Sequence, residues 1–101
     1  MNKYKFYTNR RTGGHPCIDL GYDNDGNWLT IDLTTSPKGY GYFSKNPYSK
    51  EKDKNKISFY RKYISKNNMK HKGEFLRNYS LSDEDEKKID ELIIKLKYKK
   101  R

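Results

Sequence analysis

The chain has 101 residues and a formal net charge of +10 at pH 7, which predicts a single domain with a small core. It contains seven leucines, seven isoleucines, four phenylalanines and no valine, close to the composition of disordered chains, but its ten tyrosines and one tryptophan favour a folded protein. The sequence shows no signal peptide and no apolar run long enough to cross a bilayer, so we expect a cytoplasmic protein without membrane contact.

The first third of the chain predicts three antiparallel strands. Residues 3–7 alternate basic and aromatic side chains and predict the first strand, and the polar segment 8–14, which ends in two glycines, predicts a loop. Residues 16–22 predict the second strand. The turn sequence D-N-D-G-N at 23–27 tolerates positive φ, so the strand that begins at Trp28 should return as a hairpin.

The third strand ends in hydroxyl side chains. Its residues alternate, with Leu29, Ile31 and Leu33 on one side and Trp28, Thr30 and Asp32 on the other. The strand stops in the sequence T-T-S-P-K-G at 34–39, because proline cannot donate to a ladder and glycine loosens the backbone. Three hydroxyls and a lysine are therefore expected where a buried strand meets solvent.

The middle of the chain predicts shorter and less regular elements. Residues 40–43 predict a short fourth strand, and residues 44–56, which lack periodicity, predict a mobile basic loop. Residues 57–64 are rich in strand-forming side chains and predict another strand, although neither of its faces is purely apolar. Residues 65–73 predict a basic connection, and 74–79 predict either a brief strand or a turn.

Residues 80–101 predict a helix. Ser82 is a natural N-cap with Asp85 three residues on, acidic side chains fill the first turn, and lysines fill the last. An apolar stripe is formed by Ile89, Leu92, Ile93 and Leu96. We expect the stripe to cover the sheet, with a partner interface as the alternative. The chain as a whole, 1–101, is predicted to be one α+β domain, a small antiparallel barrel over residues 1–64 followed by the helix.

The positive charge is concentrated in the middle of the chain. Residues 1–36 are net neutral, residues 37–79 carry twelve basic and three acidic side chains, and residues 80–101 have a net charge of +1. A concentrated basic surface attracts phosphate backbones, which makes RNA an expected partner. A lysine-rich solvated surface is the alternative interpretation of the same charge.

Cysteine and histidine give little sign of a metal or redox site. Cys17 is the only cysteine, so neither a disulfide within the chain nor a cysteine-based metal site can form, and we expect a small buried side chain. His15 and His71 are far apart and lack a carboxylate pattern around them. We therefore expect no metal and no cofactor.

The predicted meander brings two groups of polar side chains to the same end of the sheet. The groups are Arg10, Arg11 and His15 before the second strand, and Thr34, Thr35, Ser36 and Lys38 after the third. RNA cleavage needs one group to remove the 2′-hydroxyl proton, another to protonate the leaving oxygen, and donors for the charge that builds on the phosphate. These side chains can supply all three, although each also has an ordinary structural role as a loop charge, a turn cap or a strand residue.

Two stretches, 14–20 (G-H-P-C-I-D-L) and 29–40 (L-T-I-D-L-T-T-S-P-K-G-Y), resemble the PemK/MazF superfamily of bacterial toxins. The T-S-P-K sequence at 35–38 is similar to the ToxN/AbiQ branch, whose toxins are held by an RNA antitoxin. The resemblance implies an SH3-like barrel, metal-independent endoribonuclease activity and a cognate antitoxin. The positive charge favours RNA over protein as that antitoxin, and a homodimer is left open.

The resemblance also implies roles for individual residues. Arg10 or Arg11 would polarise the scissile phosphate, and Thr35 or Ser36 would supply the hydroxyl at the strand end. His15 stands where many members carry arginine, and we expect it to act in acid–base catalysis. The residues expected to contact RNA are Lys38, Tyr40, Arg61 and Lys62.

Two other functions stay open from the sequence alone. A non-catalytic module for RNA or single-stranded nucleic acid would combine lysine and arginine with the tyrosines at positions 40, 42, 48, 60 and 63. A phage or plasmid accessory protein would inhibit a host protein through charge and shape. Incubation with RNA in EDTA separates the enzyme from both.

Overall fold

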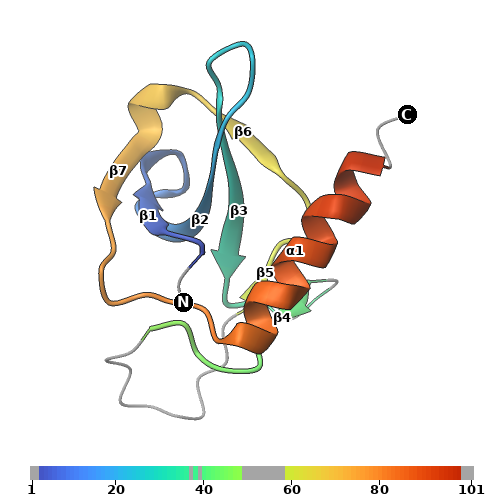
Figure 1. Cartoon of the computed structure of the whole chain (residues 1–101). Helices are drawn as coiled ribbons and strands as arrows, with labels where there is room; N and C mark the ends of the chain where they lie inside the picture. Colours follow the sequence, from blue (N-terminus) through green and yellow to red (C-terminus); the bar gives the residue numbers. More distant parts are fainter. Residues whose placement is uncertain (1–2, 37, 39, 49–58, 99–101) are drawn as a thin grey trace.

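The protein folds into a seven-stranded antiparallel sheet and one C-terminal helix, which confirms the α+β class (Figure 1). The structure is a computed structural model, and it describes residues 3–36, 38, 40–48 and 59–98. The elements are β1 (Phe6–Asn9), η1 (Arg10–Thr12), β2 (His15–Tyr22), β3 (Trp28–Thr34), β4 (Gly41–Tyr42), β5 (Phe59–Tyr60), β6 (Ser65–Asn67), η2 (Met69–His71), β7 (Lys72–Phe75) and α1 (Asp83–Tyr98).

The sheet is open in the part of the chain that the structure describes. The strand order is β4-β5-β3-β2-β1-β7, and β6 pairs with β3 beside β5. All pairings are antiparallel, and none joins β4 to β7 among the described residues, so the strands do not close into a barrel. Within these same residues no helix combines the length and the hydropathy that crossing a bilayer requires.

The predicted hairpin of the second and third strands is confirmed. Ile18 lies opposite Ile31 and Tyr22 lies opposite Trp28, with a shift of register between Asp19 and Tyr22. The Asp23 carboxylate accepts hydrogen bonds from the backbone N–H groups of Asp25 and Asn27, both at 2.9 Å, which fixes the turn. These bonds, with the one from the Asn27 side chain as the largest contribution, hold the pKa of Asp23 below its ordinary value.

The hydrophobic core lies between one side of the sheet and α1, which runs diagonally across that side in Figure 1. Its buried members are Phe6, Ile18, Ile31, Phe43, Tyr60, Leu81 and Ile89. Paired residues of an antiparallel ladder share a side of the sheet, which explains why the partners Phe6 and Ile18 are both in the core.

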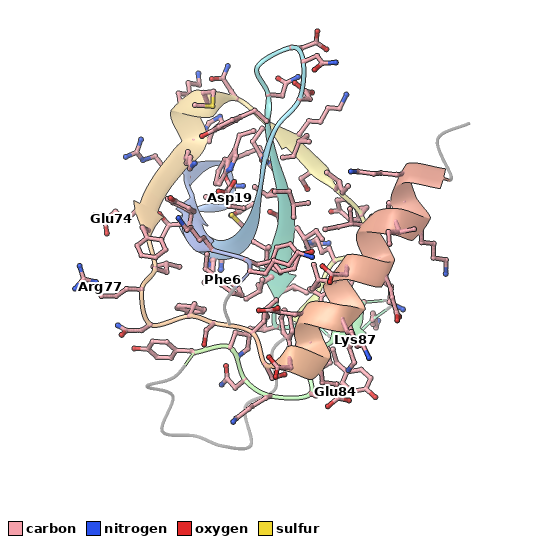
Figure 2. All side chains as sticks on the ribbon, in the orientation of Figure 1. Phe6, Asp19, Glu74, Arg77, Glu84 and Lys87 are labelled. Atoms are coloured by element: carbon pink, nitrogen blue, oxygen red, sulfur yellow. The ribbon has the colours of Figure 1, made fainter. Side chains whose placement is uncertain are left out.

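The predicted helix and its apolar stripe are confirmed. Ile89 is fully buried, Leu92 and Ile93 pack against the core, and Leu96 is half-buried, so the stripe covers the sheet. The N-cap forms as expected, because the Asp85 N–H donates to Ser82 Oγ at 3.2 Å. The charged side chains Glu84 and Lys87 point away from the sheet (Figure 2).

Several predicted element boundaries are wrong. The first strand is Phe6–Asn9 instead of 3–7, because Lys3 and Tyr4 bond to Asp90 of α1. The strand predicted over 57–64 is limited to Phe59–Tyr60 among the described residues, while residues 57 and 58 lie outside them.

The basic connection predicted over 65–73 is also wrong, since it contains β6, η2 and the start of β7. Ser65 and Asn67 are buried against β3, and this burial orders a segment whose composition reads as a loop. Residues 74–79 combine both predicted alternatives, with the end of β7 followed by a turn.

The loop predicted over 44–56 is confirmed for residues 44–47, which form neither helix nor strand, and the described segment is anchored by hydrogen bonds. The Asp85 carboxylate accepts the backbone N–H groups of Ser44 at 2.8 Å and Lys45 at 3.2 Å, and Tyr48 pairs with Tyr79. Residues 49–56 lie outside the described part of the chain. Segment 44–48 is therefore fixed against the helix and against the turn that precedes it.

Candidate functional site

The side of the sheet opposite the core holds a buried group of polar side chains. This polar network consists of Asn9, Arg11, Thr30, Asp32, Ser65 and Asn67. Asp32 is 5% exposed and accepts hydrogen bonds from Thr30 Oγ1 at 2.9 Å and Ser65 Oγ at 3.0 Å. Asn67 is 2% exposed and donates to the Trp28 carbonyl and to Thr30 Oγ1, both at 3.0 Å. These bonds compensate for the cost of burying polar groups.

The polar network holds one arginine in a fixed orientation. Arg11 Nε donates to Asn67 Oδ1 at 2.6 Å, and its Nη2 donates to Asp32 Oδ2 at 3.1 Å. The side chain of Arg11 is 42% exposed, whereas that of Asp32 is 7% exposed, so the ion pair spans the boundary between interior and solvent. The side chain of Asn9 accepts a hydrogen bond from the backbone N–H of Arg11 and thereby caps η1, the short helix that carries Arg11.

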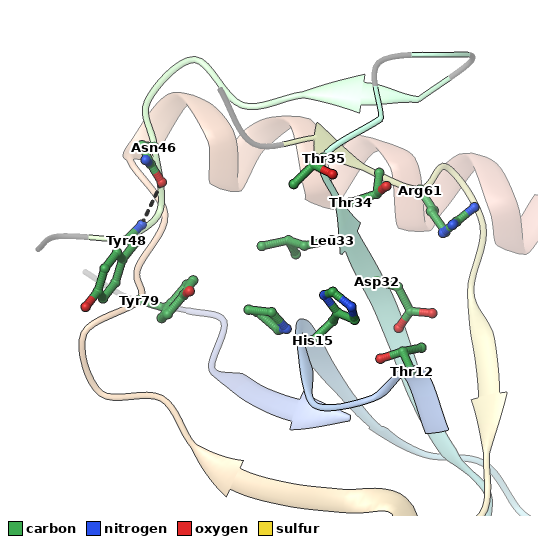
Figure 3. A pocket seen from close by; sticks show the side chains of 11 residues that line it. Thr12, His15, Asp32, Leu33, Thr34, Thr35, Asn46, Tyr48, Arg61 and Tyr79 are labelled. Atoms are coloured by element: carbon green, nitrogen blue, oxygen red, sulfur yellow. Dashed lines mark hydrogen bonds between the residues drawn. The ribbon is translucent and has the colours of Figure 1, made fainter. Parts of the chain in front are cut away.

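A cavity of about 530 Å³ opens at the end of β3, beside the polar network (Figure 3). We call it the main cavity, and it is lined by Thr12, His15, Pro16, Asp32, Leu33, Thr34, Thr35, Asn46, Tyr48, Arg61 and Tyr79. Its volume lies in the range of roughly 300–1,000 Å³ that is typical of ligand sites. Segments far apart in the sequence form its wall.

Three residues expected to act on RNA line the main cavity together. Figure 3 shows His15 from the start of β2, Thr35 after the end of β3, and Arg61 after β5 around the same hollow. The antiparallel register explains the first two, because Cys17 lies opposite Asp32 and the two strand ends are therefore neighbours. The expectation that the loop before the second strand and the end of the third meet at one end of the sheet is confirmed.

The remaining expected residues lie outside the lining of the main cavity. Arg10 points elsewhere, since its Nη1 donates to the Lys70 carbonyl at 3.1 Å. Arg11 reaches the cavity only through its ion pair with Asp32. Three more of the expected residues are exposed and do not line the cavity, although they are close in sequence to residues that do: Ser36, Lys38 and Lys62.

Arg61 is positioned by an aromatic partner. Its guanidinium carbon lies 4.8 Å from the centre of the Tyr40 ring, and its Nη1 donates to the Tyr40 hydroxyl at 2.6 Å. Such a cation–π contact orients the charge without neutralising it. Tyr40 therefore belongs to the site, although it supports Arg61 and does not line the cavity itself.

Cys17 is not available for chemistry. It is fully buried, and its thiol donates to the Tyr7 carbonyl at 3.3 Å. Burial, and after it the nearby carboxylates of Asp32 and Asp19, raise the pKa of the Cys17 thiol to about 12. The expectation of a small buried side chain is confirmed. Across the described residues, His, Cys, Asp and Glu side chains form no group of three or more that could hold a metal ion.

Sequence reasoning missed several residues of the site. The sequence places Asp32 on the same side of its strand as Thr30, and this alternation could have indicated that the two side chains interact. Tyr79 and Asn67 carried no comparable signal, because their places depend on contacts with distant segments.

Comparisons with models of protein families, with curated proteins and with solved structures give no match for this chain.

Proposed function

We propose that this protein is an endoribonuclease that cleaves RNA in the main cavity through side-chain chemistry, without a metal ion, in the manner of the PemK/MazF toxins that its sequence resembles. The observation that carries the proposal is the meeting of His15, Thr35 and Arg61 in one cavity from three separate segments. An imidazole can transfer protons, and a hydroxyl and a guanidinium can donate to the charge that develops when a phosphodiester is cleaved.

The reaction is an internal transfer on the RNA. The 2′-oxygen attacks phosphorus, the bond from phosphorus to the 5′-oxygen breaks, and a 2′,3′-cyclic phosphate and a 5′-hydroxyl result. One side chain takes the 2′-hydroxyl proton and another delivers a proton to the leaving oxygen. His15 fits one of these proton transfers, because imidazoles in general exchange protons near neutral pH and this one faces the cavity.

Arg61 and the strand-end hydroxyls fit the charge that develops on the phosphate. The planar guanidinium presents five donors, and in the described part of the chain Tyr40 occupies only one of them. The hydroxyls of Thr34 and Thr35 line the same cavity and can donate to a non-bridging oxygen. Fixed donors of this kind stabilise a transition state because they do not need to reorient.

Arg11 serves the site by neutralising Asp32. A carboxylate that lines the cavity would repel a phosphate, and the ion pair with Arg11 removes that repulsion. Arg10 and Arg11 are therefore unequal in this proposal, although they are neighbours in the sequence. Loss of Arg11 should weaken the binding of RNA, whereas loss of Arg10 should leave it nearly unchanged.

The proposal also covers the fold family and the biological role of the protein. We infer that the open sheet with its covering helix is a variant of the SH3-like barrel, and that the protein is a bacterial toxin held by a cognate antitoxin. The net charge of +10 supports an RNA antitoxin over a protein one. A homodimer stays compatible with the proposal.

Incubation with a defined single-stranded RNA in EDTA tests the proposal. We expect fragments that end in 2′,3′-cyclic phosphate, a loss of about 10²–10⁴-fold in kcat for His15→Gln, and a loss of about 10²–10³-fold for Arg61→Ala. Arg10→Ala is the matched control for Arg11→Ala. Binding without cleavage would replace the enzyme with a non-catalytic RNA-binding module, and no binding at low salt would exclude both.

A further inference from the structure

A second cavity of about 400 Å³ adjoins the main cavity. It is lined by Tyr48, Phe75, Leu76, Arg77, Asn78 and Tyr79. Tyr48 and Tyr79 line both cavities, and their rings stack with centroids 5.0 Å apart and planes inclined by 28°. The two cavities are therefore neighbours that share this stacked pair as a common wall.

The second cavity presents one aromatic ring to solvent. Phe75 lies at the end of β7, the edge strand of the sheet, and is 52% exposed. The Tyr7 ring packs against Phe75, with centroids 5.6 Å apart and planes inclined by 55°. An aromatic ring that is supported by a second ring and still half open to solvent is a platform for stacking.

A cation lies beside this platform. Arg77 follows Phe75 by two residues, is exposed, and points away from the chain segment between β7 and α1 (Figure 2). Its guanidinium carries the only full charge among the residues that line the second cavity, all of which lie in the described part of the chain. An aromatic platform with an adjacent cation is the combination by which proteins hold a base and its phosphate in single-stranded RNA.

We propose that the second cavity is a subsite for a nucleotide of single-stranded RNA adjacent to the scissile phosphate, with its base stacked on Phe75 and its phosphate paired with Arg77. The subsite rests on the proposed ribonuclease function, because the scissile phosphate of the RNA would be bound in the neighbouring main cavity. Since every base has a π-face, the subsite contributes affinity and register with little preference among bases.

The experiment measures binding of a fluorescein-labelled 2′-O-methyl oligonucleotide of four nucleotides, which cannot be cleaved because its 2′-oxygens are blocked. Fluorescence anisotropy gives Kd at several salt concentrations for the wild type, Phe75→Leu, Phe75→Trp and Arg77→Gln. Two exposed residues of α1 supply matched controls, Ile94→Ala for a lost apolar side chain and Lys87→Gln for a lost charge. Thermal unfolding establishes that each variant is folded.

The two contributions leave different signatures. Phe75→Leu should raise Kd about tenfold without changing its dependence on salt, and Phe75→Trp should restore the affinity, since only the aromatic face is needed. Arg77→Gln should also raise Kd and should reduce the slope of log Kd against log salt by about 0.7, the value for one phosphate contact on a single strand. Both control variants should match the wild type.

The outcomes separate the subsite from the ribonuclease. A wild type that cleaves RNA, combined with unchanged Kd in Phe75→Leu and Arg77→Gln, would overturn the subsite and leave the ribonuclease intact. A wild type that binds the oligonucleotide without cleaving RNA, with the expected losses in both variants, would overturn the ribonuclease and retain the subsite as part of a binding groove. A wild type that binds no oligonucleotide at low salt would overturn both.

Discussion

The two sides of the sheet are both buried, but different forces hold them. The core side, with Ile18 and Ile31, is covered by α1 and contains apolar side chains. The opposite side carries the polar network, in which Asp32 and Asn67 are joined to their neighbours by hydrogen bonds of 2.6–3.4 Å. Apolar contacts are non-directional and depend on volume, whereas hydrogen bonds depend on direction.

This difference separates stability from positioning. The side under α1 supplies the apolar burial that stabilises the fold, and it tolerates substitutions that preserve volume. The polar network determines where Arg11 points, because two acceptors fix two of its N–H groups. In the described residues every buried side-chain nitrogen and oxygen has a hydrogen-bond partner, so a single substitution in the network leaves several groups unsatisfied.

The largest loss of stability is expected on the core side. Ile31 is fully buried, and Ile31→Ala should lower the free energy of unfolding by about 3 kcal/mol, because it removes three buried carbons and leaves a cavity. Ile31→Val should lower it by about 1 kcal/mol. Urea denaturation measures both, with Ile94→Ala, at a position 55% exposed, as the control. Equal losses for alanine and valine would contradict a volume-dependent core.

The polar side should respond to chemistry and not to volume. Asn67→Leu keeps the side-chain size but removes the hydrogen bonds of Asn67 to the Trp28 carbonyl, Thr30, Asn9 and Arg11, and should lower the free energy of unfolding by about 2 kcal/mol. Asn24→Leu, in the exposed hairpin turn, is the matched control. If Asn67→Leu were as stable as the wild type in urea, this side would be ordinary packing and the comparison would fail.

The helix that covers the core side depends on a polar cap of its own. Ser82→Ala removes the acceptor for the Asp85 N–H and should lower the free energy of unfolding by about 1 kcal/mol. Ser82→Thr keeps a hydroxyl and should lose much less. Thermal unfolding followed by circular dichroism compares the two, and equal losses would show that the hydroxyl contributes nothing.

Cys17 places a titrating group on the polar side of the sheet, since it pairs with Asp32 in the ladder. Its thiol pKa is raised from an ordinary value of 9.0 to about 12, so the folded state retains a proton that the unfolded state loses. Stability from this source is complete below pH 9 and is lost as the pH rises from about 9 to about 12. The difference in the free energy of unfolding between the wild type and Cys17→Ala should narrow by about 1.4 kcal/mol for each pH unit in that window.

A labelling experiment checks the same thiol. Iodoacetamide at pH 8 should leave Cys17 unmodified in the native protein and should modify it in urea, because only the thiolate reacts. Mass spectrometry counts the modified fraction. Rapid modification of the native protein would mean that the polar side opens far more readily than its hydrogen bonds suggest.

The elements that were predictable from the sequence are those whose signals are local. The hairpin turn around Asp23 and the cap at Ser82 are encoded within a few residues, and both are confirmed. β6 escaped prediction because Ser65 and Asn67 are strand residues only through their contacts with β3. Its composition of serine, lysine and asparagine has low intrinsic preference for strands, and tertiary contacts overrode that preference.

The candidate site divides in the same way. The neighbourhood of His15 and Thr35 follows from the antiparallel connection of two adjacent strands, so chain order was enough to predict it. The different contacts of Arg10 and Arg11 could not be predicted. They depend on which of the two side chains faces Asp32 after the turn of η1. Tyr79 joins the site through its stacking with Tyr48, a contact between segments that the sequence does not relate.

The buried carboxylate of Asp85 connects α1 to the wall of the main cavity. It holds the N–H groups of Ser44 and Lys45, and this segment leads directly to Asn46 and Tyr48 in the wall of the main cavity. Every lining residue precedes α1 in the chain, yet part of the wall is held in place by α1. Because translation produces the N-terminal part first, we expect the wall of the main cavity to be incomplete in the nascent chain until α1 emerges and folds. Under the proposed ribonuclease function, RNA cleavage would begin only after α1 has folded.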